Sequence, residues 1–301
     1  METFENNPDN KLVITAALAG AATMKSQNEA VPYTAEEFGD EAKKCYDEGA
    51  AIVHLHIRDP EKGIPTPDLD LIRDALENIK SKAPDVIINL STAISAVATD
   101  RERIKPIRTF QPPLGSLNTN SMNFSVGNWK TGEVVMGAGN IFANDFRMIQ
   151  KFARYFQKAG TKPEMEIYDM GGMHNMLFLN KQEGMFDQPL HFQFVFGVLG
   201  GQPFSPRALG TLLELKPPGS TWSVCGVANQ QFQAGMCAAA LGGHVRVGLE
   251  DNIRMPNGEL AKGSWEQVRW AKKLAEVAGR EVAQGEEALK IFNCKNKEVS
   301  L

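Results

Sequence analysis

The chain of 301 residues lacks the segments that mark membrane, secreted and nucleic-acid-binding proteins. No apolar run is long enough to span a bilayer, and the N-terminal METFENNPDNK has neither the basic nor the apolar region of a secretory signal. The formal net charge is −4, and no block is rich in Lys or Arg. We therefore expect a cytoplasmic protein whose partners are neither membranes nor nucleic acids.

Cysteine is scarce, and the glycine-rich nucleotide motifs are missing. The four cysteines, Cys45, Cys225, Cys237 and Cys294, form no CxxC pair, which indicates reduced thiols. We interpret Cys225 and Cys237 as small buried residues, with a catalytic cysteine as the alternative. No GxGxxG follows the first expected strand and no Walker A sequence is present, which disfavours a nucleotide-binding open sheet.

What the chain does contain is an alternation of short β-branched runs and longer helical patterns. Most of the runs are nearly continuous in apolar residues, which is typical of parallel strands buried on both faces. Eight strands are expected, at residues 11–17, 51–57, 86–91, 113–119, 163–168, 191–196, 221–227 and 244–248.

Capping signals delimit the helices between these strands. Thr34 followed by Glu37 forms a capping box at the start of one helix. Asn144 and Gly160 are expected to cap another helix at its two ends. Further helices are expected at 68–83 and 264–280, the second of them closing the chain.

This alternation predicts a (β/α)8 TIM barrel, because repeated strand–helix units of this total length are typical of that fold. A doubly wound open sheet is the alternative. We expect one domain over residues 1–301, in which residues 1–10 are a flexible N-terminal extension. Residues 127–140 are expected to form a long loop or a small hairpin on the barrel face.

Two of the five histidines, His54 and His56, interrupt an expected strand one residue apart. Residues i and i+2 of a strand point to the same face, about 6.6 Å apart at the usual rise per residue. The pair sits near the C-terminal end of its strand, where barrel enzymes carry their active sites. We favour a divalent metal site here, and the alternative is two core histidines bonded to backbone carbonyls.

A metal held by two imidazoles needs a third ligand, often a carboxylate. Glu250 and Asp251 follow the last expected strand at the same end of the barrel, although such a pair is also common in a solvated turn. Arg246 lies inside that strand, where a guanidinium requires either an anionic substrate or a structural carboxylate.

Other strand ends also carry polar groups. Ser91 and Thr92 end the third strand, Ser116 and Asn118 share one face of the fourth, and Glu164 and Glu166 share one face of the fifth. A carboxylate inside a barrel strand is costly unless it is paired, metal-bound or functional. A single serine or asparagine at a strand end more often bonds loop backbone. The prediction of an active site therefore rests on several polar residues that occur together at the same end of the barrel.

These residues occur within motifs that resemble the β-keto acid cleavage enzymes, the group that includes 3-keto-5-aminohexanoate cleavage enzyme. The resemblance runs from about residue 11 to about residue 292. The matching motifs are ITAALAGA (14–21), VHLHIRD (53–59), INLST (88–92), SLNTNSMNF (116–124), PEMEIY (163–168), HFQFVFGVLGG (191–201) and GGHVRVGLEDN (242–252).

The resemblance implies a homotetrameric (β/α)8 barrel that binds zinc and uses acetyl-CoA as co-substrate. It implies condensation of a β-keto acid with acetyl-CoA to give acetoacetate and a new acyl-CoA. The implied zinc ligands are His54, His56 and Glu250. The implied catalytic residues are Asp251, Arg246, Glu166 and Ser91. The resemblance also implies a substrate contact at Ser116, and we add Thr92 and Asn118, which lie at the same strand ends, as substrate-binding candidates.

The chain departs from the family pattern at two places. Ala22 stands where the aminohexanoate enzyme has an acidic residue for the substrate amine, and Ala93 and Ile94 replace the usual glycines after the third strand. These changes predict a substrate with an uncharged, apolar tail, although Met122 and Phe124 could instead surround a methylated ammonium. The alternative functions are a zinc hydrolase or aldolase on the same barrel, or a non-catalytic metal-binding barrel.

Overall fold

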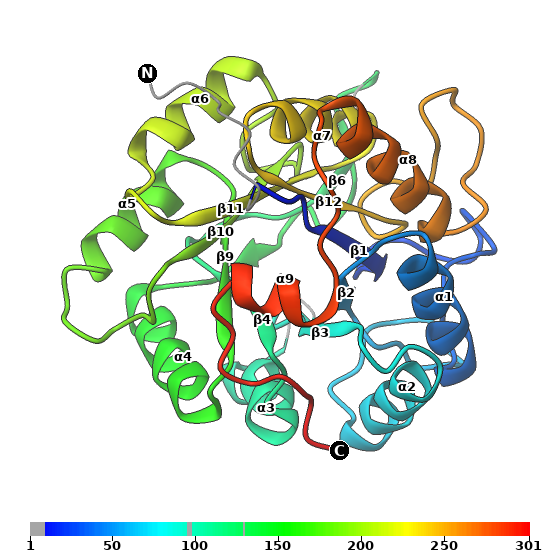
Figure 1. The fold of residues 1–301 in the computed structure, drawn as a ribbon, viewed down its shortest axis with the longest axis horizontal. Helices are drawn as coiled ribbons and strands as arrows, with labels where there is room; N and C mark the ends of the chain where they lie inside the picture. Colours follow the sequence, from blue (N-terminus) through cyan, green and yellow to red (C-terminus); the bar gives the residue numbers. More distant parts are fainter. Residues whose placement is uncertain (1–9, 95–97, 129) are drawn as a thin grey trace.

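The computed structural model describes residues 10–94, 98–128 and 130–301, and they form a closed barrel of eight parallel strands (Figure 1). The strands are β1 (Ile14–Ala19), β2 (Ile52–Leu55), β3 (Ile87–Leu90), β4 (Leu114–Asn118), β9 (Lys162–Ile167), β10 (His191–Phe196), β11 (Thr221–Gly226) and β12 (His244–Val247). Their order around the barrel is β1-β12-β11-β10-β9-β4-β3-β2. This order confirms the predicted (β/α)8 barrel and excludes the open sheet.

Helices cover the outside of the barrel, and Figure 1 shows them as a ring around the strands. The predicted capping box is confirmed, because the Thr34 side chain accepts from Glu37 N while the Glu37 side chain accepts from Thr34 N. The helices are α1 (Ala35–Asp47), α2 (Leu69–Lys82), α3 (Asp100–Phe110), α4 (Phe146–Ala159), α5 (Met170–Leu179), α6 (Pro206–Leu215), α7 (Gln230–Ala240), α8 (Ser264–Val277) and α9 (Gly285–Ile291).

The prediction that Asn144 caps α4 is wrong by one residue. Asp145 holds the N-cap position, because its carboxylate accepts from Met148 N at 2.8 Å. Asn144 is buried and instead donates to the Asn120 carbonyl at 3.0 Å. Gly160 does cap the other end of α4, with a left-handed φ of 68°.

The N-terminal end of the barrel is closed by α9, which the sequence did not predict. The last helix that the sequence predicts is observed as α8, which ends at Val277. Helix α9 follows it and lies across the end of the barrel (Figure 1). Ala288, Leu289 and Phe292 pack there with Ile52 and other apolar residues from the strand starts. In the described part of the chain, α9 thus covers the N-terminal end of the barrel, and the opposite end forms its mouth.

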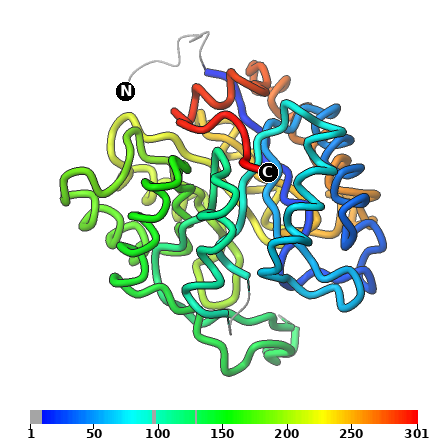
Figure 2. The backbone as a smooth tube through the Cα atoms, turned by 90° about the horizontal axis from the view of Figure 1, so that it is seen from below, coloured from blue at the N-terminus to red at the C-terminus, as the bar shows by residue number. Residues whose placement is uncertain are grey.

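The predicted hairpin lies at that opposite end. Two short antiparallel pairs, β5 (Met122–Asn123) with β8 (Ile141–Phe142) and β6 (Val126–Asn128) with β7 (Glu133–Met136), extend the chain after β4. Figure 2 shows this segment projecting from the molecule on the side away from α9. It flanks the mouth formed by the C-terminal ends of the strands.

The two faces of the strands differ in polarity. On β2, Val53 and Leu55 belong to the main apolar cluster between strands and helices, whereas the alternate residue His54 faces the interior. On β12, Val245 packs outward and Arg246 lies inside. The usual barrel interior is filled by branched apolar side chains, so this polar interior is unusual.

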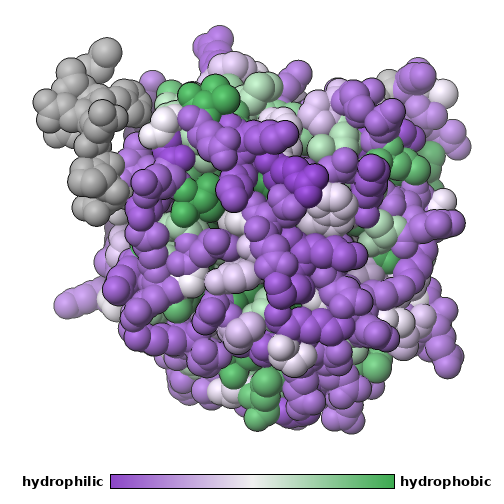
Figure 3. Space-filling model, turned by 45° about the vertical axis from the view of Figure 1, so that its right-hand side comes forward, coloured by the Kyte–Doolittle hydropathy of each residue, from purple (hydrophilic) through white to green (hydrophobic). Residues whose placement is uncertain are grey.

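The outer surface of the molecule, in contrast to the barrel interior, has on the face in Figure 3 the polarity usual for a globular protein. The face in Figure 3 is mostly hydrophilic, with apolar residues in small scattered patches. Among the described residues, no helix combines the length and apolar character that a bilayer crossing requires. Cys225 is buried as predicted, whereas Cys237 is only partly buried. The predicted flexible extension, residues 1–10, lies outside the described residues except for Asn10, and the single-domain assignment stays a prediction.

Candidate active site at the barrel mouth

The structure brings His54, His56 and Glu250 together. The histidines come from the end of β2 and Glu250 from just after β12, and β1 lies between these two strands. His54 Nε2 is 3.7 Å and His56 Nε2 is 3.4 Å from Glu250 Oε1. One potential ligand atom from each residue lies within 4.8 Å of the others, an arrangement that could hold a metal ion.

The chemistry of these donors fits a divalent metal. Both ring nitrogens of His54 and Oε2 of Glu250 are buried without a hydrogen-bond partner among the described residues. Burial, together with the charge of Arg246, lowers the pKa of His54 to about 3. His54 is therefore neutral at physiological pH, the form in which an imidazole binds a metal.

A glycine makes room for the carboxylate. Gly20 directly follows β1, and a Cβ atom at this position would lie 2.3 Å from Glu250 Cγ. Since real Cβ atoms essentially never approach another carbon so closely, Glu250 can occupy this position only beside a glycine.

Arg246 joins His54, His56 and Glu250 to two further acids. Its Nη2 donates to Glu250 Oε1 at 2.6 Å, and its Nε donates to Asp251 Oδ2 at 2.8 Å. Its Nη1 lies 3.6 Å from Glu166 Oε1. Burial alone would raise the pKa of Glu250, but the guanidinium holds that pKa well below its ordinary value. The arginine thus keeps Glu250 ionised.

The pKa values of Asp251 and Glu166 are shifted upward, in the opposite direction to that of Glu250. Burial raises the pKa of Asp251 in spite of its two bonds from Arg246. Burial also raises the pKa of Glu166 to about 7, although Arg246 opposes the shift. A carboxyl group that titrates near neutral pH can both accept and give up a proton, as general acid–base catalysis requires.

Tyr168 is a residue of this site that the sequence analysis missed. Its hydroxyl lies 3.0 Å from Glu166 Oε2 and 3.1 Å from Asn118 Oδ1. Burial raises its pKa well above the ordinary value, so it remains a neutral hydrogen-bonding group. The period of two that places Glu164 and Glu166 on one face extends to Tyr168, and that signal could have found it.

The predicted serine and threonine residues lie beside the cluster but are already engaged. Thr92 Oγ1 donates to the Ser116 carbonyl at 2.7 Å, and Ser116 Oγ accepts from Thr92 N at 3.2 Å. Ser91 Oγ accepts from Ala93 N at 3.1 Å, and Ser91 and His56 line one small cavity. Ala22 is half-buried in the loop after β1. Nothing in these contacts tests the predicted substrate roles.

An apolar cluster forms another part of the mouth. It comprises Met122, Phe142, Tyr168, Val195 and Cys225, all buried, with Ala93, Phe124 and Val198 partly buried against them. Its members come from the ends of β9, β10 and β11 and from the β5–β8 pair. Tyr168 connects this cluster to the acids, because its ring packs against Phe142 and its hydroxyl contacts Glu166.

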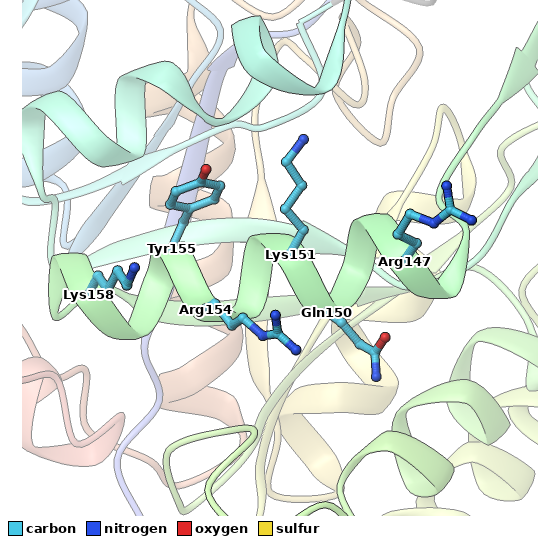
Figure 4. Close-up of a pocket in the computed structure, with 6 residues that line it drawn as sticks. All are labelled: Arg147, Gln150, Lys151, Arg154, Tyr155 and Lys158. Atoms are coloured by element: carbon cyan, nitrogen blue, oxygen red, sulfur yellow. The ribbon is translucent and has the colours of Figure 1, made fainter.

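A separate concave surface lies outside the barrel. Figure 4 shows that its labelled side chains all come from α4. Four of them are basic: Arg147, Lys151, Arg154 and Lys158. This surface holds none of the acids or histidines described above, so we place the candidate active site at the mouth.

A parallel barrel that gathers an arginine, several buried acids and a possible metal cluster at its strand ends has the organisation of a barrel enzyme. A family model described as beta-keto acid cleavage enzyme matches residues 11–293. The chain therefore belongs to the β-keto acid cleavage enzyme family, and it is an enzyme of the acyltransferase class.

Named relatives agree with this assignment. The chain is 41% identical over 285 residues to "3-keto-5-aminohexanoate cleavage enzyme" of Fusobacterium nucleatum subsp. nucleatum, covering 95% of this chain and 98% of the relative. It is 34% identical over 301 residues to "3,5-dioxohexanoate:acetyl-CoA acetone transferase" of Paraburkholderia graminis, covering 95% and 96%. The solved "Binary complex of ObcA with oxaloacetate" matches with a TM-score of 0.70 and 21% identity, covering 88% of this chain and 67% of that chain, which supports the fold alone.

Proposed function

We propose that the protein is a zinc-dependent enzyme that condenses a β-keto acid with acetyl-CoA, giving acetoacetate and a new acyl-CoA. The observation that carries the proposal is the placement of His54, His56 and Glu250 next to the Arg246–Asp251 pair. The name of the Paraburkholderia graminis relative includes acetyl-CoA, which supports the choice of co-substrate.

His54, His56 and Glu250 would hold the zinc ion, with its remaining positions open to substrate. When bound, the ion supplies Lewis acidity, which acidifies the carbon between the keto and carboxylate groups of the substrate. The protein's part is to keep His54 neutral and Glu250 ionised, which burial and Arg246 respectively achieve.

Asp251 is the proposed base that removes the proton from that carbon. It directly follows Glu250 in the chain, which would put it near a substrate bound at the metal, and Arg246 donates to both of its oxygens. Arg246 also offsets negative charge that develops on the enolate or on the neighbouring carboxylate. The raised pKa of Asp251 makes it a stronger base than an exposed aspartate.

The resulting carbanion attacks the thioester carbonyl of acetyl-CoA and expels the CoA thiolate. The thiolate then attacks the original keto carbon, so that acetoacetate leaves and a new acyl-CoA remains. Glu166 and Ser91 are proposed to move protons and orient the reactants during these steps. With a pKa of about 7, Glu166 can exchange protons in either direction.

Ser116, Thr92 and Asn118 are proposed to shape the substrate pocket. Asn118 is the best placed to contact a ligand, because its Nδ2 is a buried donor without a partner among the described residues. Thr92 and Ser116 bond to each other and so fix the relative position of the β3 and β4 ends.

The substrate tail is proposed to be uncharged and apolar. Ala22 offers no carboxylate to a cationic amine, and the apolar cluster of Phe142, Val195 and neighbouring residues offers a surface that suits hydrocarbon. The same aromatic side chains could hold a methylated ammonium, so a panel of substrates must include both kinds.

We also propose that the enzyme is a cytoplasmic homotetramer. The free state of its four cysteines agrees with a reducing compartment. Exposed apolar side chains on the hairpin at the mouth, such as Val135 and Met136, offer surface for another copy. Light scattering coupled to size-exclusion chromatography measures the assembly, and a monomer at micromolar concentration would contradict this part of the proposal.

Incubation with acetoacetate and a panel of acyl-CoAs, with and without a chelator, tests the function. Acetyl-CoA that forms only in the absence of chelator, and forms again when zinc is restored, supports the proposal. Loss of thioester without acyl exchange indicates a hydrolase instead. No turnover with any acyl-CoA refutes the proposal and leaves a metal-binding barrel without this activity.

A further inference from the structure

Below the metal cluster, the barrel interior contains a second polar layer to which the proposed chemistry assigns no role. Asn89 on β3, Glu164 on β9 and His191 on β10 are all at most 1% exposed. Buried charged and polar groups are costly unless they are bonded, so a layer of this kind calls for a reason.

Asn89 and His191 contact the two oxygens of Glu164. Asn89 Nδ2 donates to Glu164 Oε1 at 2.8 Å. His191 Nε2 lies 3.4 Å from the other oxygen, Glu164 Oε2, and His191 Nδ1 lies 3.0 Å from Thr221 Oγ1. Glu164, His191 and Thr221 are register partners on three adjacent strands, so the backbone fixes this arrangement.

The carboxylate at the centre of the layer is charged. Burial favours its neutral form, but the contact with His191 and the charge of Arg246 hold the pKa of Glu164 below its ordinary value. An ionised carboxylate at this depth acts on its neighbours through a medium of low dielectric, where hydrogen bonds are strong.

Asn89 connects this layer to the metal cluster. It is the register partner of His54 on the adjacent strand, so both side chains face the barrel interior. His54 Nδ1 and Asn89 Oδ1 are both buried and unpartnered among the described residues. With a metal ion bound to Nε2, the nitrogen turned toward Glu250, Nδ1 would carry the proton and be a donor, whereas the amide oxygen is an acceptor.

We propose that Glu164 is a positioning residue for the metal site: through the Asn89 amide, directly or across one water, it fixes the ring of His54. A histidine that binds a metal almost always donates its other ring N–H to a carbonyl, carboxylate or water, and this bond raises its basicity as a ligand. Glu164 polarises the amide that accepts the bond, and His191 and Thr221 hold Glu164 in place. The inference rests on the metal-dependent part of the proposed function.

The test measures zinc affinity by competition with a chromophoric chelator, without any assay of turnover. Glu164→Gln keeps the shape and removes the charge, and we expect zinc binding about tenfold weaker or more, the range for loss of such partners. Asn89→Ala removes the amide and should have a similar effect. Because Glu164 and Asn89 act through one chain of bonds, their effects should not add. The double variant should bind zinc as tightly as the single variant with the lower zinc affinity.

Ser223→Ala is the matched control. Ser223 Oγ donates to Gln193 Oε1 at 2.6 Å, so this variant also removes a buried hydrogen bond inside the barrel, but one without contact to Asn89 or Glu164. It should leave zinc affinity unchanged while lowering the thermal stability of the metal-free protein as the other variants do.

Three results would overturn the inference. They are zinc affinity of Glu164→Gln within about twofold of the wild type, an equal loss in Ser223→Ala, and independent, multiplying losses in the double variant. If the wild type binds one zinc ion per chain and Glu164→Gln binds it equally well, only this inference fails. If the wild type binds no zinc, the metal-dependent function fails with it.

Discussion

Replacing Gly20 with alanine should weaken zinc binding although none of the three proposed ligand residues is substituted. The new Cβ would lie 2.3 Å from Glu250 Cγ and 3.0 Å from Glu250 Cδ. Carbon atoms in contact prefer about 3.5–4.0 Å, so the Glu250 side chain must retreat by roughly 1 Å or more. Its bond of 2.6 Å to Arg246 would then exceed hydrogen-bond length. The backbone is no obstacle, because Gly20 has no positive φ.

A displacement of this size sets the expected magnitude. A misplacement of about 1 Å at a catalytic centre costs about 100-fold in rate. We expect zinc affinity to fall by about 10- to 100-fold, equivalent to roughly 1.4–2.8 kcal/mol of binding free energy. Chelator competition measures the affinity, and the thioester exchange assay measures the rate.

Gly210→Ala provides the control. Gly210 lies in α6, and a Cβ there would meet nothing within 4 Å. Alanine should stabilise that helix by about 0.5–1 kcal/mol and leave zinc affinity unchanged. The reasoning about Gly20 is refuted if Gly20→Ala binds zinc within about twofold of the wild type, because Glu250 would then not depend on the space.

Other variants test the remaining assignments. Glu250→Ala or His54→Ala should lower the zinc content measured by elemental analysis, and unchanged content would contradict the ligand assignment. Asp251→Asn should retain zinc and lose thioester exchange; if exchange persists, the base lies elsewhere, with Glu166 the next candidate. Ala22→Glu should gain activity on amino-bearing β-keto acids, and no gain would contradict the specificity argument. Because the folded pKa of Glu166 is about 7 against an ordinary 4.5, the metal-free wild type should lose stability relative to Glu166→Gln as pH rises from about 4.5 to about 7, by roughly 3 kcal/mol in all. Urea unfolding at about pH 5 and about pH 8 checks this sign, and a difference independent of pH would contradict the burial argument.

Most of the fold could be predicted from the sequence, because the signals were local. Each of the eight predicted strands overlaps an observed strand, since apolar β-branched runs were sufficient to locate them. The helix α9 gave no usable period because it has only seven residues and starts at Gly285. The N-cap of α4 was misplaced by one residue, since Asn144 and Asp145 are both good caps and tertiary bonds to Asn144 decide between them.

The candidate site was predictable only in part. The spacing of His54 and His56 indicated a metal pair, and the position of Glu250 and Asp251 after the last strand offered a third ligand. The resemblance then singled out Glu250 of these two acids. No local pattern indicated that Gly20 must be small, because its neighbour Glu250 lies 230 residues later in the sequence. The bond from Asn89 to Glu164 joins β3 to β9 past the intervening β4, and only the strand order brings these residues, 75 apart in the sequence, together.

Closure of the barrel by its first and last strands also bears on how the chain is made. Strand β1 pairs with β12 through Ile14 with Val245 and Thr15 with Arg246, and His244 is synthesised 231 residues after Val13. During translation β1 therefore waits with one edge unpaired, and such an edge can pair with strands of other nascent chains. Glu250 emerges only after β12, so the growing polypeptide cannot complete its barrel, or bring Glu250 to His54 and His56, until that strand has been synthesised.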